Sequence, residues 1–188
     1  MTKRSKIANR TSAPRIALTP MASGRDAEFA AMLEEYRRVG ETHVYSGHQS
    51  IAWKGYAAYF ALLAKMKPGG YPTAGIVPMD AYFIEENGRI LGELFIRHRL
   101  SPSLEKMGGH VGYKVRPSCR NRGVATAALR LALEKLRALG VERALVTCNA
   151  TNAASSKVIR KCGGVRTSDA HLEDRIEQRY WVPTTPAS

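Results

Sequence analysis

The chain has 188 residues, of which 44% are hydrophobic and 24% are charged. This size and this balance are typical of one soluble globular domain with a sizeable core. The longest apolar run, residues 56–64, is far shorter than the ~20 residues of a membrane-spanning helix. No apolar segment of a secretory signal follows the basic N-terminus. We therefore expect a cytoplasmic protein without membrane contact.

The chain contains three cysteines, Cys119, Cys148 and Cys162. An odd number of cysteines without zinc-type spacing predicts free thiols in a reducing compartment. The histidines show no ligand spacing either, so the sequence predicts no metal site.

The formal net charge is +13, and part of it lies in residues 1–14, which contain basic side chains and no acid. We predict a disordered basic tail at residues 1–14, one domain at residues 15–184 and a flexible C-terminus at residues 185–188. A basic surface attracts polyanions in general, and it suits a specific acidic substrate equally well. The composition leaves both interpretations open.

Hydrophobic periodicity and turn residues predict an alternation of strands and helices along the chain. The predicted strands are residues 15–21, 80–85, 89–100, 109–115, 141–148 and 177–182, and the predicted helices are residues 26–39, 51–67, 123–139 and 152–161. Asn87-Gly88 is the strongest hairpin signal. The helix at 123–139 has an apolar stripe of Ala125, Ala128, Leu129, Ala132, Leu136 and Leu139. This order predicts a mixed α/β domain, with one layer of sheet and helices on its faces.

The most informative junction is the loop between the strand 109–115 and the helix 123–139. A helix start offers unpaired N–H groups and the positive end of the helix dipole, and both favour phosphate. Gly123 and Ala125 keep the first turn small, and Arg120 and Arg122 add donors suited to a pyrophosphate. The pattern is neither the GxGxxG dinucleotide motif nor the GxxxxGK[ST] loop, which argues against NAD and ATP.

The run from residue 112 to residue 164, which begins GYKVRPSCRNRGVATAAL, resembles the core of the GNAT superfamily of N-acetyltransferases. Residues 120–125 match the family's Q/R-x-x-G-x-G/A signature. The segments RHRL, GGHVGY and QRYW are similar to a subgroup of bacterial GNAT proteins. The resemblance implies a single domain with a mostly antiparallel central sheet and helices on both faces. It also implies that acetyl-CoA donates an acetyl group to a primary amine, which attacks directly in a ternary complex.

The resemblance assigns positions to the cofactor. Backbone groups near Val115 and Arg116 would pair with the pantetheine arm, and N–H groups at the helix start would hold the pyrophosphate. The residues assigned to acetyl-CoA are Val115, Arg116, Arg120, Arg122, Gly123, Val124, Ala125, Thr126, Asn149, Asn152 and Ser155. The chain departs from the family at Ile159, where a tyrosine that protonates the departing thiolate is common.

Three residues are candidates for proton transfer. His110 has an unperturbed pKa suited to a base near pH 7. Glu93, on the preceding strand, shares a face with apolar side chains, an environment typical of functional carboxylates. Tyr180 is a candidate substitute for the missing tyrosine. A structural hydrogen bond or ion pair is the alternative for His110 and Glu93, and packing beside Trp181 is the alternative for Tyr180.

Two other functions remain open. A basic domain with an arginine-rich loop suits a nucleic-acid-binding or ribosome-associated module, although the chain lacks the recognition signatures of such modules. A CoA-binding regulator without catalysis is compatible with Ile159. The motifs favour the enzyme over both. The acceptor amine is not determined, although the positive charge disfavours polycationic acceptors, and we expect a monomer or a homodimer.

Overall fold

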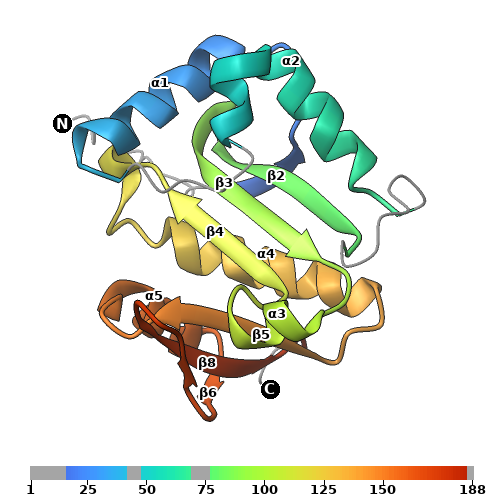
Figure 1. Ribbon diagram of the computed structural model, residues 1–188, viewed down its shortest axis with the longest axis vertical. Helices are drawn as coiled ribbons and strands as arrows, with labels where there is room; N and C mark the ends of the chain where they lie inside the picture. Colours follow the sequence, from blue (N-terminus) through green and yellow to red (C-terminus); the bar gives the residue numbers. More distant parts are fainter. Residues whose placement is uncertain (1–15, 42–47, 69–76, 186–188) are drawn as a thin grey trace, which may run out of the picture.

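The computed structural model describes residues 16–41, 48–68 and 77–185 (Figure 1). The predicted basic tail and residues 186–188 of the predicted C-terminal segment lie outside these ranges. The helices and strands, in chain order, are β1 (Ile16–Pro20), α1 (Asp26–Arg38), α2 (Gln49–Lys65), β2 (Met79–Glu86), β3 (Arg89–Arg97), α3 (Pro102–Lys106), β4 (Val111–Val115), the 3-10 helix η2 (Pro117–Cys119), α4 (Val124–Ala138), β5 (Arg143–Asn149), α5 (Ala153–Lys161), β6 (Val165–Arg166), β7 (Ala170–His171) and β8 (Ile176–Pro183).

The first four strands form an antiparallel sheet in chain order, β1-β2-β3-β4. β2 and β3 are joined at Asn87 and Gly88, whose φ angles of 51° and 80° are both positive. A two-residue hairpin turn of this type requires positive φ at both positions, which asparagine and glycine tolerate best. The predicted hairpin is therefore confirmed.

Helices α1 and α2 cover one face of this sheet (Figure 1). α1 buries Phe29, Met32 and Tyr36, the face that the sequence pattern predicts. α2 differs from the prediction of one regular helix, because Gly55 has φ 76° and ψ 172° and interrupts the helical backbone. A glycine adopts such angles without a steric penalty, so α2 is kinked there.

Helix α4 covers the opposite face of the sheet (Figure 1). It buries Val124, Ala128, Leu129, Ala132, Leu133 and Leu136. This spacing is that of one face of a helix and matches most of the predicted stripe. Leu139 departs from the stripe: it is 46% exposed, because it is the C-cap residue, where the helix ends.

The remaining strands form a second sheet in the order β5-β8-β6, with β7 also paired to β8. The single layer of sheet predicted from the sequence is therefore divided between β4 and β5. One hydrophobic core nevertheless joins both parts, because side chains of β3, β4, α4, β5 and β8 pack together in it. The domain is a mixed α/β fold with antiparallel sheets, as the sequence predicts.

Candidate functional site

The loop after β4 leads into the uncapped N-terminus of α4. Gly123 is the N-cap residue and has φ 80°, in the left-handed region, and no side chain of the described residues caps the helix. The first N–H groups of a helix have no partner within it and carry the positive end of its dipole. The start of α4 is therefore a place where backbone donors are available to an anion.

The backbone of β4 presents its outer edge to the same region. The Arg116 N–H donates to the Leu91 carbonyl across the ladder to β3, at 2.8 Å. The backbone N–H and C=O groups of successive residues point to opposite edges of a strand, so those of Lys114, two residues earlier, also point toward β3. The backbone N–H and C=O groups of Tyr113 and Val115 consequently point away from β3. They lie toward the space between β4 and β5, where an extended ligand can pair with them.

β4 and β5 are joined at one end only. The His110 N–H donates to the Leu145 carbonyl at 2.7 Å, and the Leu145 N–H donates to His110 Nδ1 at 2.9 Å. Gly109 makes this close approach possible: its φ is +58°, and a Cβ at this position would collide with the Leu145 carbonyl oxygen. Beyond this junction β4 and β5 are not paired in either sheet, so the strands diverge toward Val115 and Asn149.

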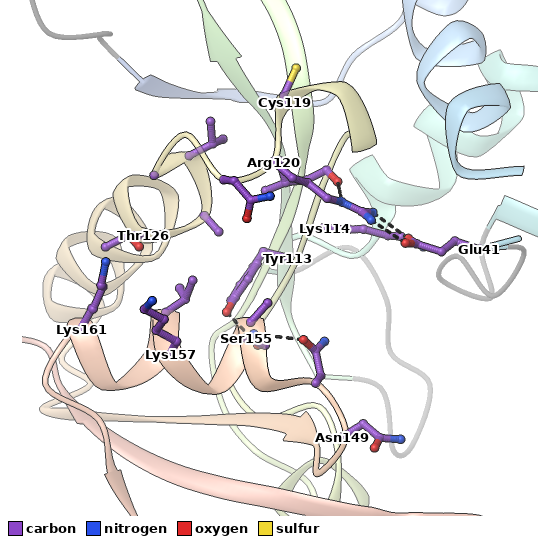
Figure 2. Close-up of a pocket in the computed structure, with 18 of the residues that line it drawn as sticks. Glu41, Tyr113, Lys114, Cys119, Arg120, Thr126, Asn149, Ser155, Lys157 and Lys161 are labelled. Atoms are coloured by element: carbon purple, nitrogen blue, oxygen red, sulfur yellow. Dashed lines mark hydrogen bonds and ion pairs between the residues drawn. The ribbon is translucent and has the colours of Figure 1, made fainter. Parts of the chain in front are cut away.

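A cavity of about 1030 Å³ occupies the opening that this divergence leaves (Figure 2). Its volume is that of a site for a large organic ligand. It is lined by Glu41, Tyr113, Lys114, Val115, Cys119, Arg120, Asn121, Gly123, Val124, Ala125, Thr126, Asn149, Thr151, Asn152, Ala154, Ser155, Lys157, Val158 and Lys161. The structure thus brings together most of the residues assigned to the cofactor from the sequence.

Glu41 forms ion pairs with two basic side chains that line the cavity. Both terminal nitrogens of Arg120 donate to its carboxylate, at 2.6 and 2.8 Å, and Lys114 Nζ lies 3.1 Å from it. The hydrogen bond from Arg120 is the main reason why the pKa of Glu41 is lowered. Arg120 Nε also donates to the Val115 carbonyl at 3.0 Å. The Arg120 guanidinium therefore connects the loop before α4 to β4 and to the segment that follows α1.

Helix α5 forms the opposite wall. Asn152 is its N-cap, and the asparagine side chain accepts a hydrogen bond from the Ser155 N–H. The Ser155 hydroxyl lies 2.9 Å from the Tyr113 hydroxyl inside the cavity (Figure 2). Burial raises the pKa of Tyr113 well above its usual range, so the phenol stays protonated near neutral pH. Asn149, at the end of β5, accepts hydrogen bonds from the N–H and hydroxyl of Thr151.

Two arginines assigned to the cofactor do not line this cavity. Arg116 is buried, and its Nε donates to Glu35 at 2.6 Å. Arg122 is paired with Glu86 at 2.8 Å. Both side chains thus fix the loop to neighbouring elements. The backbone of Arg116 is engaged as well, because its N–H donates to the Leu91 carbonyl and its carbonyl accepts from the Cys119 N–H, each at 2.8 Å.

The three candidates for proton transfer also lie outside the cavity lining. Glu93 is completely buried below α1 and α2, with one carboxylate oxygen 3.0 Å from His48 Nε2. Tyr180 is equally buried, and its hydroxyl lies 2.8 Å from the Ser156 hydroxyl and donates to Gln178 at 2.7 Å. The third, His110, is held at the β4–β5 junction. Their catalytic roles stay predictions.

The structure places Ile159, the position of the departure, away from the cavity lining. This side chain is fully buried in the core, whereas its neighbour Val158 lines the cavity. Other lining residues are not among those assigned from the sequence. Tyr113 lies two residues before Val115 and therefore shares its face of β4, and Lys157 and Lys161 share a face of α5 through their spacing of four, so these spacings are the signals that point to them.

The ranges that the structure describes contain no helix long and apolar enough to cross a membrane. They also contain no group of three or more His, Cys, Asp or Glu side chains that could hold a metal ion.

Comparisons with known proteins give the family and the fold. The model of the acetyltransferase (GNAT) domain matches residues 15–165, while a search of curated proteins finds no match. Mycobacterium smegmatis RimJ, solved in complex with CoA-disulfide, has a TM-score of 0.69 and 20% identity, over 91% of this chain and 83% of that chain. RimL, a ribosomal L7/L12 alpha-N-protein acetyltransferase in complex with coenzyme A, has a TM-score of 0.67 and 14% identity, over 92% and 95%.

A third structure, yncA from Salmonella typhimurium with its cofactor acetyl-CoA, has a TM-score of 0.55 and 14% identity, over 92% of this chain and 96% of that chain. At these identities the three structures show a common fold.

Proposed function

The chain belongs to the GNAT acetyltransferase family and is an acyl-CoA-dependent N-acetyltransferase, and we propose that it transfers an acetyl group from acetyl-CoA to a primary amine by direct attack in a ternary complex. The observation that carries this proposal is the cavity between β4 and β5, which opens onto the uncapped start of α4. The neighbours in fold include structures with CoA or acetyl-CoA bound.

Successive parts of acetyl-CoA can be matched to successive parts of the cavity. The pyrophosphate would take the N–H groups at the start of α4, from Gly123 to Thr126, because these donors are uncapped. The pantetheine arm would pair with the outward-facing backbone of Tyr113 and Val115, as an added strand pairs with a sheet edge. The thioester would then lie deeper, where the strands diverge beside Asn149.

In the reaction, the neutral amine attacks the thioester carbonyl, the new N–C bond forms and the C–S bond breaks. An outward-facing backbone N–H of β4 near Val115 that does not pair with the pantetheine arm would stabilise the oxyanion. The departing thiolate, with a pKa of about 8.5 for an ordinary thiol, needs a proton. Tyr113 and Ser155 line the cavity and are 2.9 Å apart. Because burial makes the Tyr113 phenol a weaker acid than the thiol, we propose that the proton comes from solvent and that this hydroxyl pair donates a hydrogen bond to the departing sulfur.

The amine must lose a proton in this reaction. His110 has its Nδ1 lone pair engaged by the Leu145 N–H, so its neutral ring carries the hydrogen on Nε2 and has no free lone pair. Glu93 is buried on the side of the sheet that α1 and α2 cover, where it contacts His48, the N-cap residue of α2. We therefore propose that water in the open cavity takes this proton to bulk solvent, and assign His110 a positioning role.

The acceptor is proposed from charge and from the neighbours. The net charge of +13 disfavours a polycation and favours a neutral or acidic amine. RimL acts on the alpha-amino group of a ribosomal protein. A protein N-terminus in an acidic segment fits both considerations.

Thermal unfolding with acetyl-CoA tests the proposal on the native chain, Gly123→Glu and Gly140→Glu. Both glycines have φ near +80° and open space at Cβ, at opposite ends of α4, so the two variants share their backbone strain. A ligand at 100 times its Kd stabilises by about 2.7 kcal/mol, roughly 5–11 °C in a chain of this size.

The native chain and Gly140→Glu should show this shift, while Gly123→Glu should not, because its carboxylate repels the pyrophosphate. No shift in the native chain would contradict the proposal. A shift without acetyl transfer to a panel of peptides with acidic N-terminal segments would identify a CoA-binding regulator instead.

A further inference from the structure

The wall of the cavity formed by α5 carries two lysines with no assigned role. Lys157 and Lys161 are four residues apart and therefore lie on the same side of the helix, about 6 Å apart along its axis. Both are exposed and both line the cavity. Figure 2 shows their side chains extending into it, with Lys161 beside Thr126 of α4.

These lysines differ from the other cations around the cavity in having no acidic partner. Arg120 and Lys114 share Glu41, which is the only acid among the described residues that line the cavity. In the described part of the chain, Lys157 and Lys161 form no ion pair. The α5 wall is therefore a positive surface without compensation, and such a surface favours an anionic ligand group.

The position of the two lysines relates them to the start of α4. Cys162, next to Lys161, places its Sγ 3.7 Å from the Thr126 carbonyl oxygen, so the end of α5 packs against the first turn of α4. A phosphate group near Lys157 and Lys161 would thus neighbour the pyrophosphate without occupying its donors. CoA carries one such group, the phosphate on its ribose 3′ oxygen.

We infer that Lys157 and Lys161 bind the 3′-phosphate of CoA and make the protein select CoA over 3′-dephospho-CoA. This inference rests on the proposed function, because it assumes CoA in the cavity. Two ammonium groups one helical turn apart flank a single phosphate, and lysine serves as a point charge for such a group. The ion pairs are exposed, so their contribution is modest and falls with salt.

Isothermal titration with CoA and with 3′-dephospho-CoA tests the inference. The native chain should bind CoA about tenfold more tightly, and this ratio should shrink at high salt. In the double variant Lys157→Gln/Lys161→Gln the ratio should fall to about one, with the affinity for 3′-dephospho-CoA nearly unchanged.

Arg160→Gln is the matched control. Arg160 is exposed on the same helix and its guanidinium lies 6.0 Å from the centre of the Tyr180 ring, outside the cavity lining. Its substitution by glutamine removes one positive charge from the same helix without touching the cavity, so the selectivity should stay native.

Three outcomes would overturn the inference. The native chain could bind both nucleotides equally, or the lysine substitutions could weaken both equally, which would assign these lysines to the pyrophosphate. Equal loss of selectivity in Arg160→Gln would assign the effect to overall charge. Failure to bind either nucleotide would refute the proposed function itself, which is a separate result.

Discussion

The role of His110 can be decided by comparing His110→Ala with His110→Asn. In the native chain His110 Nδ1 accepts a hydrogen bond from the Leu145 N–H at 2.9 Å, and Leu145 is fully buried. Alanine leaves this N–H without an acceptor, which costs about 1–3 kcal/mol. The asparagine Oδ1 occupies nearly the place of Nδ1 and should retain most of the stability. Urea unfolding at pH 7.5 measures the difference.

The same histidine predicts a pH dependence. Burial, and then the charge of Arg97, lower the pKa of His110 in the folded protein, while the unfolded chain keeps a pKa of about 6.5. Below pH 6.5 the unfolded state binds the proton and the folded state does not, so stability falls as the pH falls toward the lowered pKa. His110→Asn should lose less stability than the native chain between pH 7.5 and pH 5.

Turnover completes this test. A general base would make His110→Asn lose about 10²- to 10⁴-fold in kcat/KM, whereas a positioning residue would leave it near the native value. The positioning role of His110 is refuted if His110→Ala is as stable as the native chain. It is also refuted if His110→Asn keeps its stability but loses turnover by the factor expected of a base.

Three further predictions address other residues of the site and core. Gly123→Ala and Gly140→Ala should each lose about 1–2 kcal/mol of folding stability, because both positions have left-handed φ and open space at Cβ. Thermal unfolding should show similar losses for the two variants. Only Gly123→Ala should weaken acetyl-CoA binding in titration. Glu93→Gln changes a buried contact with His48 and should cost about 1–3 kcal/mol in urea unfolding, so an unchanged midpoint would contradict it. Tyr180→Phe deletes two partly buried hydroxyl contacts and should cost about 1–2 kcal/mol. The pH profile of kcat should be preserved, whereas an acid role would alter that profile.

Local patterns in the sequence are sufficient for most of the secondary structure and for the position of the loop that leads into α4. The turn at Asn87-Gly88 and the stop at Gly40 follow from backbone conformations that few other residues adopt. The stripe on α4 follows from helical spacing, and Gly123 marks the start of that helix because it takes the left-handed conformation. These signals act within a few residues of chain, so they survive without tertiary contacts.

The proton-transfer residues and the shape of the cavity depend on contacts between distant parts of the chain. Side-chain chemistry alone makes His110 a candidate general base, but the N–H of Leu145, 35 residues away, donates to its ring nitrogen. Arg120 was assigned to phosphate, and Glu41, 79 residues away, pairs with it. The divergence of β4 and β5 has no sequence pattern, since it arises where two sheets share one core but pair at a single junction. Burial and pairing across such distances are properties of the folded arrangement, and they decide which polar groups face the ligand.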